Sequence, residues 1–316
     1  MQRVWVINPD AEQELLHHRL RPGSPYQAPA SLYKATHDMS HKFRHLTEQD
    51  ALIMADYSRG ATLCDAPPRE VSCWCPTANL RQLVERCWGL TLRAPSMDVL
   101  AQCNDKLLVS TFTSCLEERA PVQSVAELDA LILERRWGSG DAQSKSVGDG
   151  ARATVRLKRR FGQAGRGQRR VNEFLSADDR RFIKDSQKWG GLIVEPELDV
   201  VNNLSIHGVV SPAGLLTGAP CSFQTDRFSS PNSTLVVVDE SSSSRTDELR
   251  RVAEDVAATL EHLGYFGPFG LDFIVTQAGR LALVDINARF TLGFSTGLGR
   301  QRDAALALID CAMRPS

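Results

Sequence analysis

The sequence lacks the features that mark membrane, secreted and zinc-stapled proteins. No apolar run approaches the roughly 20 residues that span a bilayer, and the first ten residues turn polar too soon for a signal peptide. The eight cysteines show no paired C-x-x-C spacing, which argues against a zinc site or a disulfide framework. We therefore expect a cytoplasmic protein with reduced cysteines and no membrane partner.

Two signatures of catalysis and one of nucleic-acid binding are missing as well. The β-branched run over residues 3–8 is not followed by G-x-G-x-x-G, so a dinucleotide site has no support there. The sequence presents no recognisable Ser-His-Asp or Cys-His set. The net charge is −1, so the overall charge suggests no nucleic-acid partner. Lysine is scarce, with seven residues among 37 basic ones, and each lysine in a motif is therefore informative.

Three histidines form a regular pattern near the start of the chain. His37, His41 and His45 recur at every fourth position and would share one face of a helix, where imidazoles can ligate a transition metal. A polar, exposed helix face explains the same spacing, and the lack of a nearby acidic partner favours that interpretation. We assign no metal to these histidines.

The alternation of apolar runs divides the chain into two parts. Residues 1–94 contain three short apolar runs and intervening helical patterns, which predict a small α/β domain. We expect residues 95–316 to form the second part, with a glycine-rich lobe over residues 152–190 and a lobe that carries the candidate metal ligands over residues 191–316. The expected fold class is α/β, or α+β in the second part, where runs of strands alternate less regularly with helices.

The densest group of candidate ligands lies between residues 264 and 293. Two apolar runs flank Gln-Ala-Gly-Arg there, a pattern typical of an antiparallel hairpin that can bring Asp272 beside Asp285. Alternate residues of a strand share one face, so Asp285, Asn287 and Arg289 line up on it. Two carboxylates and an amide oxygen suit Mg²⁺. The alternative is an exposed edge hairpin with unrelated polar residues.

A second candidate region is basic and rich in glycine. A strand pattern ends at Lys158, and arginines alternate in the following loop with three glycines, namely Gly162, Gly165 and Gly167. Such a loop lets backbone amides close on a phosphate chain while basic side chains neutralise it. Lys106 begins another expected helix, where the helix dipole disfavours its charge unless an anion is bound. An RNA-binding loop and a merely exposed hairpin are the alternatives, and the single aromatic residue, Phe161, argues against RNA.

Five segments, in this order along the chain, resemble the motifs of the ATP-grasp superfamily. They are Asn104-Asp105-Lys106, Lys158 before the glycine loop, Ile193-Val194-Glu195, Asp272, and Asp285-Ile286-Asn287-Ala288-Arg289. The resemblance covers about residues 95–300, and residues 1–90 resemble the α/β domain that usually precedes this fold. It implies two lobes that enclose ATP, preceded by a small α/β N-terminal domain, and homodimers are frequent in the superfamily.

The resemblance also implies roles in nucleotide binding. Lys106 and Lys158 would bind the phosphates, and the glycine loop would cover them. The hinge whose backbone pairs with adenine would consist of Ile193, Val194 and Glu195. Asn203, or its neighbour Asn202, would bind the ribose at a position where many relatives have an acid.

At the hairpin, the resemblance implies a metal site and a substrate contact. The Mg²⁺ ligands would be Asp272, Asp285 and Asn287, although the second carboxylate of the superfamily is usually a longer glutamate. Arg289 matches the arginine of the biotin-carboxylase-like branch, so Arg289 and Lys158 would act on the acyl phosphate or carboxylate. Gly270 stands where the D-alanine ligase branch has an arginine, which weakens that assignment.

The expected function is an ATP-dependent carboxylate-amine ligase that forms ADP and an amide or peptide bond. The carboxylate would be activated as an acyl phosphate, and both substrates would be small molecules such as amino acids or peptides. This chemistry needs positioning and electrostatics more than a protein nucleophile. The alternatives are an ATP-binding module without turnover, an enzyme that uses bicarbonate or a thiol, and an RNA-binding protein.

Overall fold

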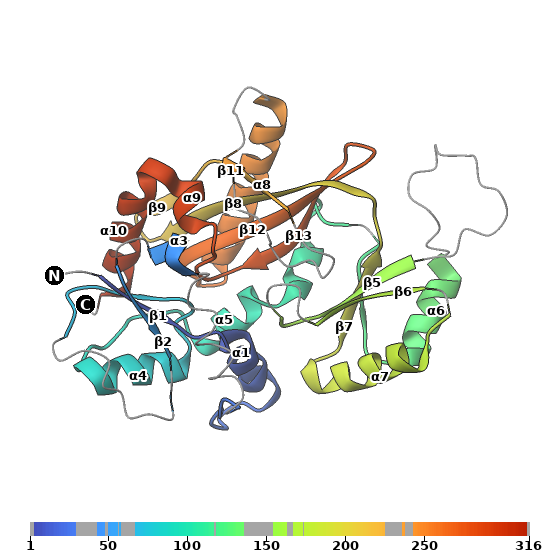
Figure 1. Cartoon of the computed structure of the whole chain (residues 1–316), viewed down its shortest axis with the longest axis horizontal. Coiled ribbons are helices and arrows are strands. Elements are labelled where there is room, and N and C mark those ends of the chain that lie inside the picture. The colour runs from blue at the N-terminus through green and yellow to red at the C-terminus, as the bar shows by residue number, and fades with distance from the viewer. Residues whose placement is uncertain are drawn as a thin grey trace.

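A computed structural model describes most of the chain and arranges it around three β-sheets (Figure 1). The described residues are 3–29, 43–47, 50–55, 57, 67–116, 118–135, 154–162, 167–172, 174–224, 236–237 and 243–314. His37 and His41 lie outside these ranges, as does the side chain of His45, so the histidine pattern remains a prediction.

The first sheet is parallel, with strand order β2-β1-β3. Its strands are β1 (Val4–Ile7), β2 (Ala51–Met54) and β3 (Val71–Cys73). All four residues of β1 are buried, because β1 is the central strand and is covered on both faces. The accompanying helices are α1 (Ala11–Leu20), α3 (Arg44–Thr47) and α4 (Ala78–Trp88).

The largest sheet has six strands in the order β11-β10-β8-β12-β13, with β9 paired to β8. Its pairs are antiparallel, and the strands are β8 (Val200–Ser211), β9 (Gly214–Thr217), β10 (Cys221–Phe223), β11 (Val236–Val237), β12 (Gly267–Thr276) and β13 (Leu281–Asn287). Alternation along β12 places Leu271 and Phe273 in the main core and Asp272 on the opposite face. The sheet therefore has one apolar face and one face that carries candidate ligands.

Helices close the apolar side of this sheet. Within α8 (Ser243–His262), Leu249, Val256 and Leu260 are spaced to face inward and are buried in the main core. Both α8 and α10 (Arg302–Met313) contact β8. Shorter elements join the parts of the chain: α5 (Met97–Cys103), the 3₁₀ helix η2 (Lys106–Thr111), α9 (Phe294–Leu298) and the 3₁₀ helix η4 (Gly299–Gln301).

The third sheet belongs to a smaller lobe, at the right of Figure 1, with strand order β4-β7-β5-β6. Its strands are β4 (Ala120–Val122), β5 (Thr154–Arg159), β6 (Gln168–Asn172) and β7 (Leu192–Pro196). The helical elements are α6 (Val125–Arg135), α7 (Ala177–Ser186) and the 3₁₀ helix η3 (Gln187–Trp189). This lobe has a separate hydrophobic core that includes Leu128, Leu157 and Val194.

The sequence patterns found the main elements but missed several short ones. The predicted hairpin over residues 264–293 is confirmed as β12 and β13. Strands β4, β6 and β10 and helix α9 were missed, and residues 168–170 form part of β6 rather than of the glycine-rich loop. Arginines hide the apolar pattern of β6, whose Arg169 pairs with Asp179 of α7. The lobe's sheet also includes β4 and β7, which lie outside residues 152–190.

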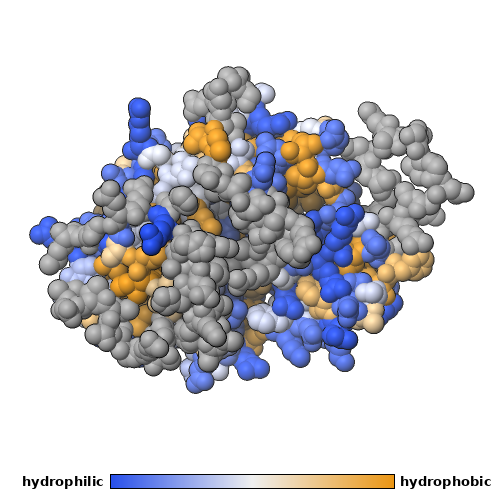
Figure 2. All heavy atoms as spheres, viewed as in Figure 1, coloured by the Kyte–Doolittle hydropathy of each residue, from blue (hydrophilic) through white to orange (hydrophobic). Residues whose placement is uncertain are grey.

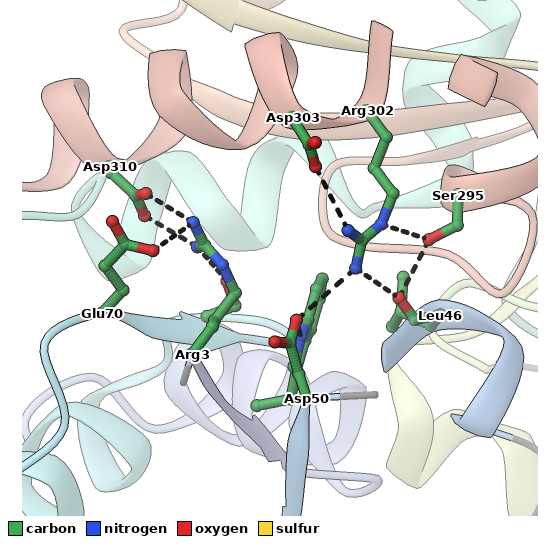
Figure 3. Close-up of polar contacts among 10 residues, drawn as sticks. Arg3, Leu46, Asp50, Glu70, Ser295, Arg302, Asp303 and Asp310 are labelled. Atoms are coloured by element: carbon green, nitrogen blue, oxygen red, sulfur yellow. Dashed lines mark hydrogen bonds and ion pairs between the residues drawn. The ribbon is translucent and has the colours of Figure 1, made fainter. Parts of the chain in front are cut away.

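Arginine side chains attach the N-terminal sheet to the C-terminal helices (Figure 3). Arg3, just before β1, donates from both terminal nitrogens to the carboxylate of Asp310 on α10, at 2.7 and 2.9 Å. The same guanidinium binds Glu70 at 2.8 Å. Arg302, which begins α10, donates to Ser295 at 3.1 Å and lies 3.5 Å from Asp50. The first and last parts of the chain are therefore held together by planar, charge-assisted contacts.

On the face drawn in Figure 2, hydrophobic residues form small separate spots among hydrophilic ones. Within the described residues, every helix is too short or too polar to cross a bilayer.

The Arg3 contact leads to a prediction about stability. Arg3→Met leaves the mostly buried Asp310 without its forked partner, so the free energy of unfolding should fall by about 2–3 kcal/mol. Lys188→Met is the control, because its pair with Asp185 is exposed and 3.7 Å long, and should change stability by less than about 1 kcal/mol. Urea unfolding of both variants provides the measurement. Equal losses in the two would contradict this account of how the sheet is attached.

Candidate active site

Two carboxylates face each other across the β12–β13 hairpin. The strand register pairs Asp272 with Asp285, and it also pairs Asp272 with Ser205 on β8. The pairing of β12 with β13 shifts directly after Asp272, which places a bulge beside the two carboxylates. Asn287 lies two residues beyond Asp285 and donates its amide to Asp272 at 3.2 Å. The structure therefore brings together the three side chains that the sequence proposes for metal binding.

The electrostatics of these side chains fit a hard cation. Burial, and then repulsion from Asp285, raise the pKa of Asp272 to about 6. Oδ2 of Asp285 pairs with Lys106, whereas Oδ1 of Asp285 is buried without a hydrogen-bond partner among the described residues. A cation such as Mg²⁺ would satisfy that oxygen and relieve the repulsion. The described residues contain no cluster of three or more His, Cys, Asp or Glu side chains suited to a metal, so the amide of Asn287 has to complete the set.

Lys106 reaches this site from the start of η2. Asp105 caps η2 by accepting a hydrogen bond from the backbone N–H of Leu107 at 3.0 Å, and its carboxylate is also held by Arg160. Asn104 is bonded in both directions to the backbone of Ala288, at 3.1 and 3.2 Å, next to the metal candidates. The segment Asn104-Asp105-Lys106 is therefore attached to the hairpin, and the buried ammonium of Lys106 lies against Asp285.

Lys158 approaches from the smaller lobe and shares a carboxylate with a buried arginine. Its ammonium pairs with one oxygen of Glu195, and the guanidinium of Arg119 lies 3.3 Å from the other. All three side chains are buried. Burial lowers the pKa of Lys158, and Arg119 lowers it further while Glu195 opposes the shift. Burial is thus the main cause that disfavours the charge of Lys158, and a further anion nearby would favour that charge.

The predicted adenine hinge lies in the middle of the small sheet. Ile193 and Val194 are paired with β5 on one side and with β4 on the other. Glu195 and Pro196 are paired only with β5, so a strand edge becomes open at Glu195. The open backbone edge of this strand therefore begins at Glu195, because the backbone groups of Ile193 and Val194 face strands on both sides, and the adenine hinge stays a prediction.

The structure describes three of the four remaining candidates for nucleotide binding, namely Asn203, Gly162 and Gly167. Asn203 lies on β8 two residues before Ser205, so it shares a sheet face with Ser205 and with Asp272 opposite. Gly162 and Gly167 flank the loop after β5, and Gly167 adopts a positive φ of 79° while its carbonyl accepts a hydrogen bond from Arg159. Gly165 lies outside the described residues, and the loop's role as a phosphate cover stays a prediction.

Arg289 is buried in a network that reaches the N-terminal domain. It donates to Glu12 of α1 at 2.7 Å, to Asn287 at 2.8 Å and to the carbonyl of Phe290 at 3.1 Å. Its guanidinium also lies over the ring of Trp74, 5.1 Å from the ring centre. Arg289 thus lies two residues beyond Asn287 and next to the metal candidates, as the sequence predicts. The orientation of its guanidinium depends on Glu12 and Trp74.

Gly270 has a structural reason to be glycine. A Cβ there would lie 2.7 Å from a methyl carbon of Thr291 and 3.0 Å from the ring of His207. Those two side chains are hydrogen-bonded to each other at 2.9 Å, and burial lowers the pKa of His207 to about 4. A neutral His207 and Thr291 therefore fill the space beside Gly270.

Three residues of the site escape sequence reasoning. Arg119 follows two glutamates in a short charged segment that matches no motif. Glu12 is one of several acids in an ordinary helix, and Trp74 follows a short strand. None has a spacing that points to the hairpin, because each reaches the site only through the tertiary fold. The one available signal is the two-residue spacing of Asn287 and Arg289. It predicts that Arg289 lies beside the metal candidates, but it does not predict which side chains contact Arg289.

Comparison with known proteins identifies the fold. No protein-family model matches the sequence, and no curated protein matches it. The crystal structure of D-cycloserine synthetase is similar with a TM-score of 0.57 at 12% identity, over 97% of this chain and 98% of that chain. The chain has the ATP-grasp fold. The fold implied by the order of the five motifs is therefore confirmed.

Two further crystal structures with this fold contain nucleotide. The N5-carboxyaminoimidazole synthetase from Staphylococcus aureus, complexed with ADP, has a TM-score of 0.54 at 13% identity, over 100% of this chain and 78% of that chain. An Aspergillus clavatus N5-carboxyaminoimidazole synthase, in complex with ADP and 5-aminoimidazole ribonucleotide, has a TM-score of 0.51 at 17% identity, over 100% and 77%. At these identities the likeness establishes the fold.

The carboxylate pair leads to a prediction about titration. In Mg²⁺-free buffer Asp272 should titrate near pH 6, so its contribution to stability is present below about pH 4 and is lost as the pH rises through 6. Mg²⁺ should lower this midpoint, because the cation favours the ionised carboxylate. Carboxyl ¹³C NMR, with Asp272→Asn to assign the signal, measures both values. A midpoint that does not respond to millimolar Mg²⁺ would exclude Asp272 as a ligand.

Proposed function

We propose that the protein is an ATP-dependent ligase that activates a carboxylate as an acyl phosphate and joins it to an amine, with release of ADP. The observation that carries the proposal is the ion pair of Lys106 with Asp285, which faces Asp272 across the hairpin, together with the buried Lys158 of the smaller lobe, in an ATP-grasp fold. A lysine from η2 beside two acids and an amide, and a second lysine from β5 of the smaller lobe, suit a triphosphate with its metal. The substrates would be small carboxylates and amines, such as amino acids or peptides.

The lysines would bind and neutralise the phosphates. Lys106 extends from η2 beside the large sheet and Lys158 from β5 of the small sheet, so a triphosphate between them would contact both lobes. Asp272, Asp285 and Asn287 would hold Mg²⁺, which supplies charge stabilisation to the transferring phosphoryl group. The protein's own contribution is to hold these groups in place before the substrates arrive, which supports catalysis by positioning and electrostatics.

Arg289 would orient the carboxylate substrate. Its planar fork suits a carboxylate or an acyl phosphate, and the contacts with Glu12 and Trp74 fix its direction. Nε of Arg289 is buried without a hydrogen-bond partner among the described residues, which leaves donor capacity at the guanidinium. Because Glu12 belongs to α1, the N-terminal domain would take part in the substrate site.

Phosphate release is the direct test of this function. The protein with Mg²⁺ and ATP is incubated with a matrix of small carboxylates and amines, and both phosphate and ADP are measured. A ligase should release phosphate only with a matching carboxylate, and an amine should increase the release. Release of AMP and pyrophosphate, or tight ATP binding without turnover for any pair, would contradict the proposal.

Neutralising either lysine should weaken ATP binding. Lys106→Met and Lys158→Met each remove a charge-assisted contact, so the binding free energy should fall by about 1.5–3 kcal/mol. Lys184→Met is the matched control, since Lys184 is exposed on α7 and should leave affinity unchanged. Isothermal titration calorimetry with ATP and Mg²⁺ measures the difference. Unchanged affinity in both site variants would remove the central support for the nucleotide site.

Arg289→Lys should separate turnover from nucleotide binding. A lysine keeps the charge but cannot reproduce the fork, so turnover should fall by a factor of about 10–1000. ATP and Mg²⁺ affinity should change little, because the substitution keeps the positive charge beside Asn287 and leaves the carboxylates of Asp272 and Asp285 in place. Single-turnover phosphate transfer and calorimetry give the two quantities, with thermal unfolding as a check on the fold. Full turnover in the variant, or loss of ATP binding, would show that Arg289 does not contact the carboxylate.

A further inference from the structure

Arg119 contacts three segments of the candidate nucleotide site, at Lys106, Val284 and Glu195, although it belongs to none of the sequence motifs. Its side chain has no exposed surface, and it lies just before β4, between η2 and the smaller lobe. One terminal nitrogen donates to the carbonyl of Lys106 at 2.7 Å. The other donates to the carbonyl of Val284 at 3.0 Å and lies 3.3 Å from Glu195.

The strand register explains why Arg119 meets Glu195. Ala120 is paired with Val194 in the antiparallel β4–β7 ladder, so the preceding residue, Arg119, comes opposite the following residue, Glu195. Lys158 approaches the same carboxylate from the other neighbouring strand, β5. Glu195 is therefore placed between two cations by the pairing of three strands.

The charges of this buried triad do not cancel. Arg119 and Lys158 each carry a positive charge, and Glu195 supplies one negative charge, so the triad has a net charge of about +1 when all three are ionised. Without Arg119, the pair of Lys158 and Glu195 would be neutral and would offer no net charge to an anion. A buried, uncancelled positive charge is costly unless an anion compensates it.

We propose that Arg119 is a positioning residue of the phosphate site, which neutralises Glu195 so that the charge of Lys158 remains available to the phosphates of a nucleotide. This inference rests on the proposed binding of ATP. Glu195 then has two roles: it holds the Lys158 ammonium in place, and its charge is balanced by Arg119 rather than by Lys158 alone. Arg119 itself need not touch the nucleotide.

A purely structural role is the competing explanation. The hydrogen bonds to the carbonyls of Lys106 and Val284 join η2 to β13, and their loss would loosen the site whatever the charge. The two explanations predict different effects on ATP affinity when Glu195 is substituted in addition to Arg119. A charge role predicts that removing Glu195 compensates for the loss of Arg119, whereas a structural role predicts no compensation.

The test compares ATP and adenosine binding in four variants of the full chain. The net charge of the triad is unchanged in Arg119→Lys, falls by one in Arg119→Met, rises by one in Glu195→Gln, and is restored in the double variant Arg119→Met with Glu195→Gln. The expected ATP affinity falls about 10-fold in Arg119→Met and returns to within about 3-fold of the parent in both Arg119→Lys and the double variant. Glu195→Gln alone should bind ATP at least as tightly as the parent.

Adenosine is the control ligand, because it has no phosphates and its affinity should be equal in all four variants. The inference is overturned if the double variant binds ATP as weakly as Arg119→Met, if Arg119→Lys is as weak as Arg119→Met, or if adenosine loses affinity in parallel. If Arg119→Met does not fold, the double variant and Glu195→Gln still decide the question. Failure of the parent protein to bind ATP would instead contradict the proposed function.

Discussion

The structure of the site depends on two carboxylates that share one strand pair. Antiparallel pairing of β12 with β13 sets Asp272 against Asp285, a like-charge arrangement that is unfavourable on its own. The protein partly offsets it with the ammonium of Lys106 and the amide of Asn287, while burial, and then repulsion from Asp285, raise the pKa of Asp272. The proposed cation site rests on this arrangement more directly than on any sequence motif.

The three sheets meet at this strand pair through a few buried polar contacts. Asn104 joins the start of η2 to the hairpin, Arg119 joins the smaller lobe to both, and Arg289 joins the N-terminal domain through Glu12. Each link is a charged or amide side chain bonded to backbone or to an opposite charge, which satisfies groups that would be costly to bury alone. The site is therefore built at the junction of all three sheets.

The resemblance of five ordered segments to ATP-grasp motifs implied the fold, and local patterns predicted several of its elements. The hairpin and the pairing of Asp272 with Asp285 follow from periodicity and turn chemistry. Strands β4 and β6 were missed because three residues or an arginine-rich run give too weak a signal. Arg119 and Glu12 could not be found, since their partners lie far along the chain and meet them only in the folded protein.

The central claim is that a substrate carboxylate attacks ATP to form an acyl phosphate. It is tested most directly with the carboxylate substrate labelled with ¹⁸O at both oxygens, in the presence of ATP, Mg²⁺ and the amine. The account predicts that one ¹⁸O atom appears in the released phosphate, because the carboxylate oxygen that attacks the phosphoryl group leaves with it. Mass spectrometry of the phosphate gives the answer, and phosphate released without ¹⁸O during amide formation would contradict the account.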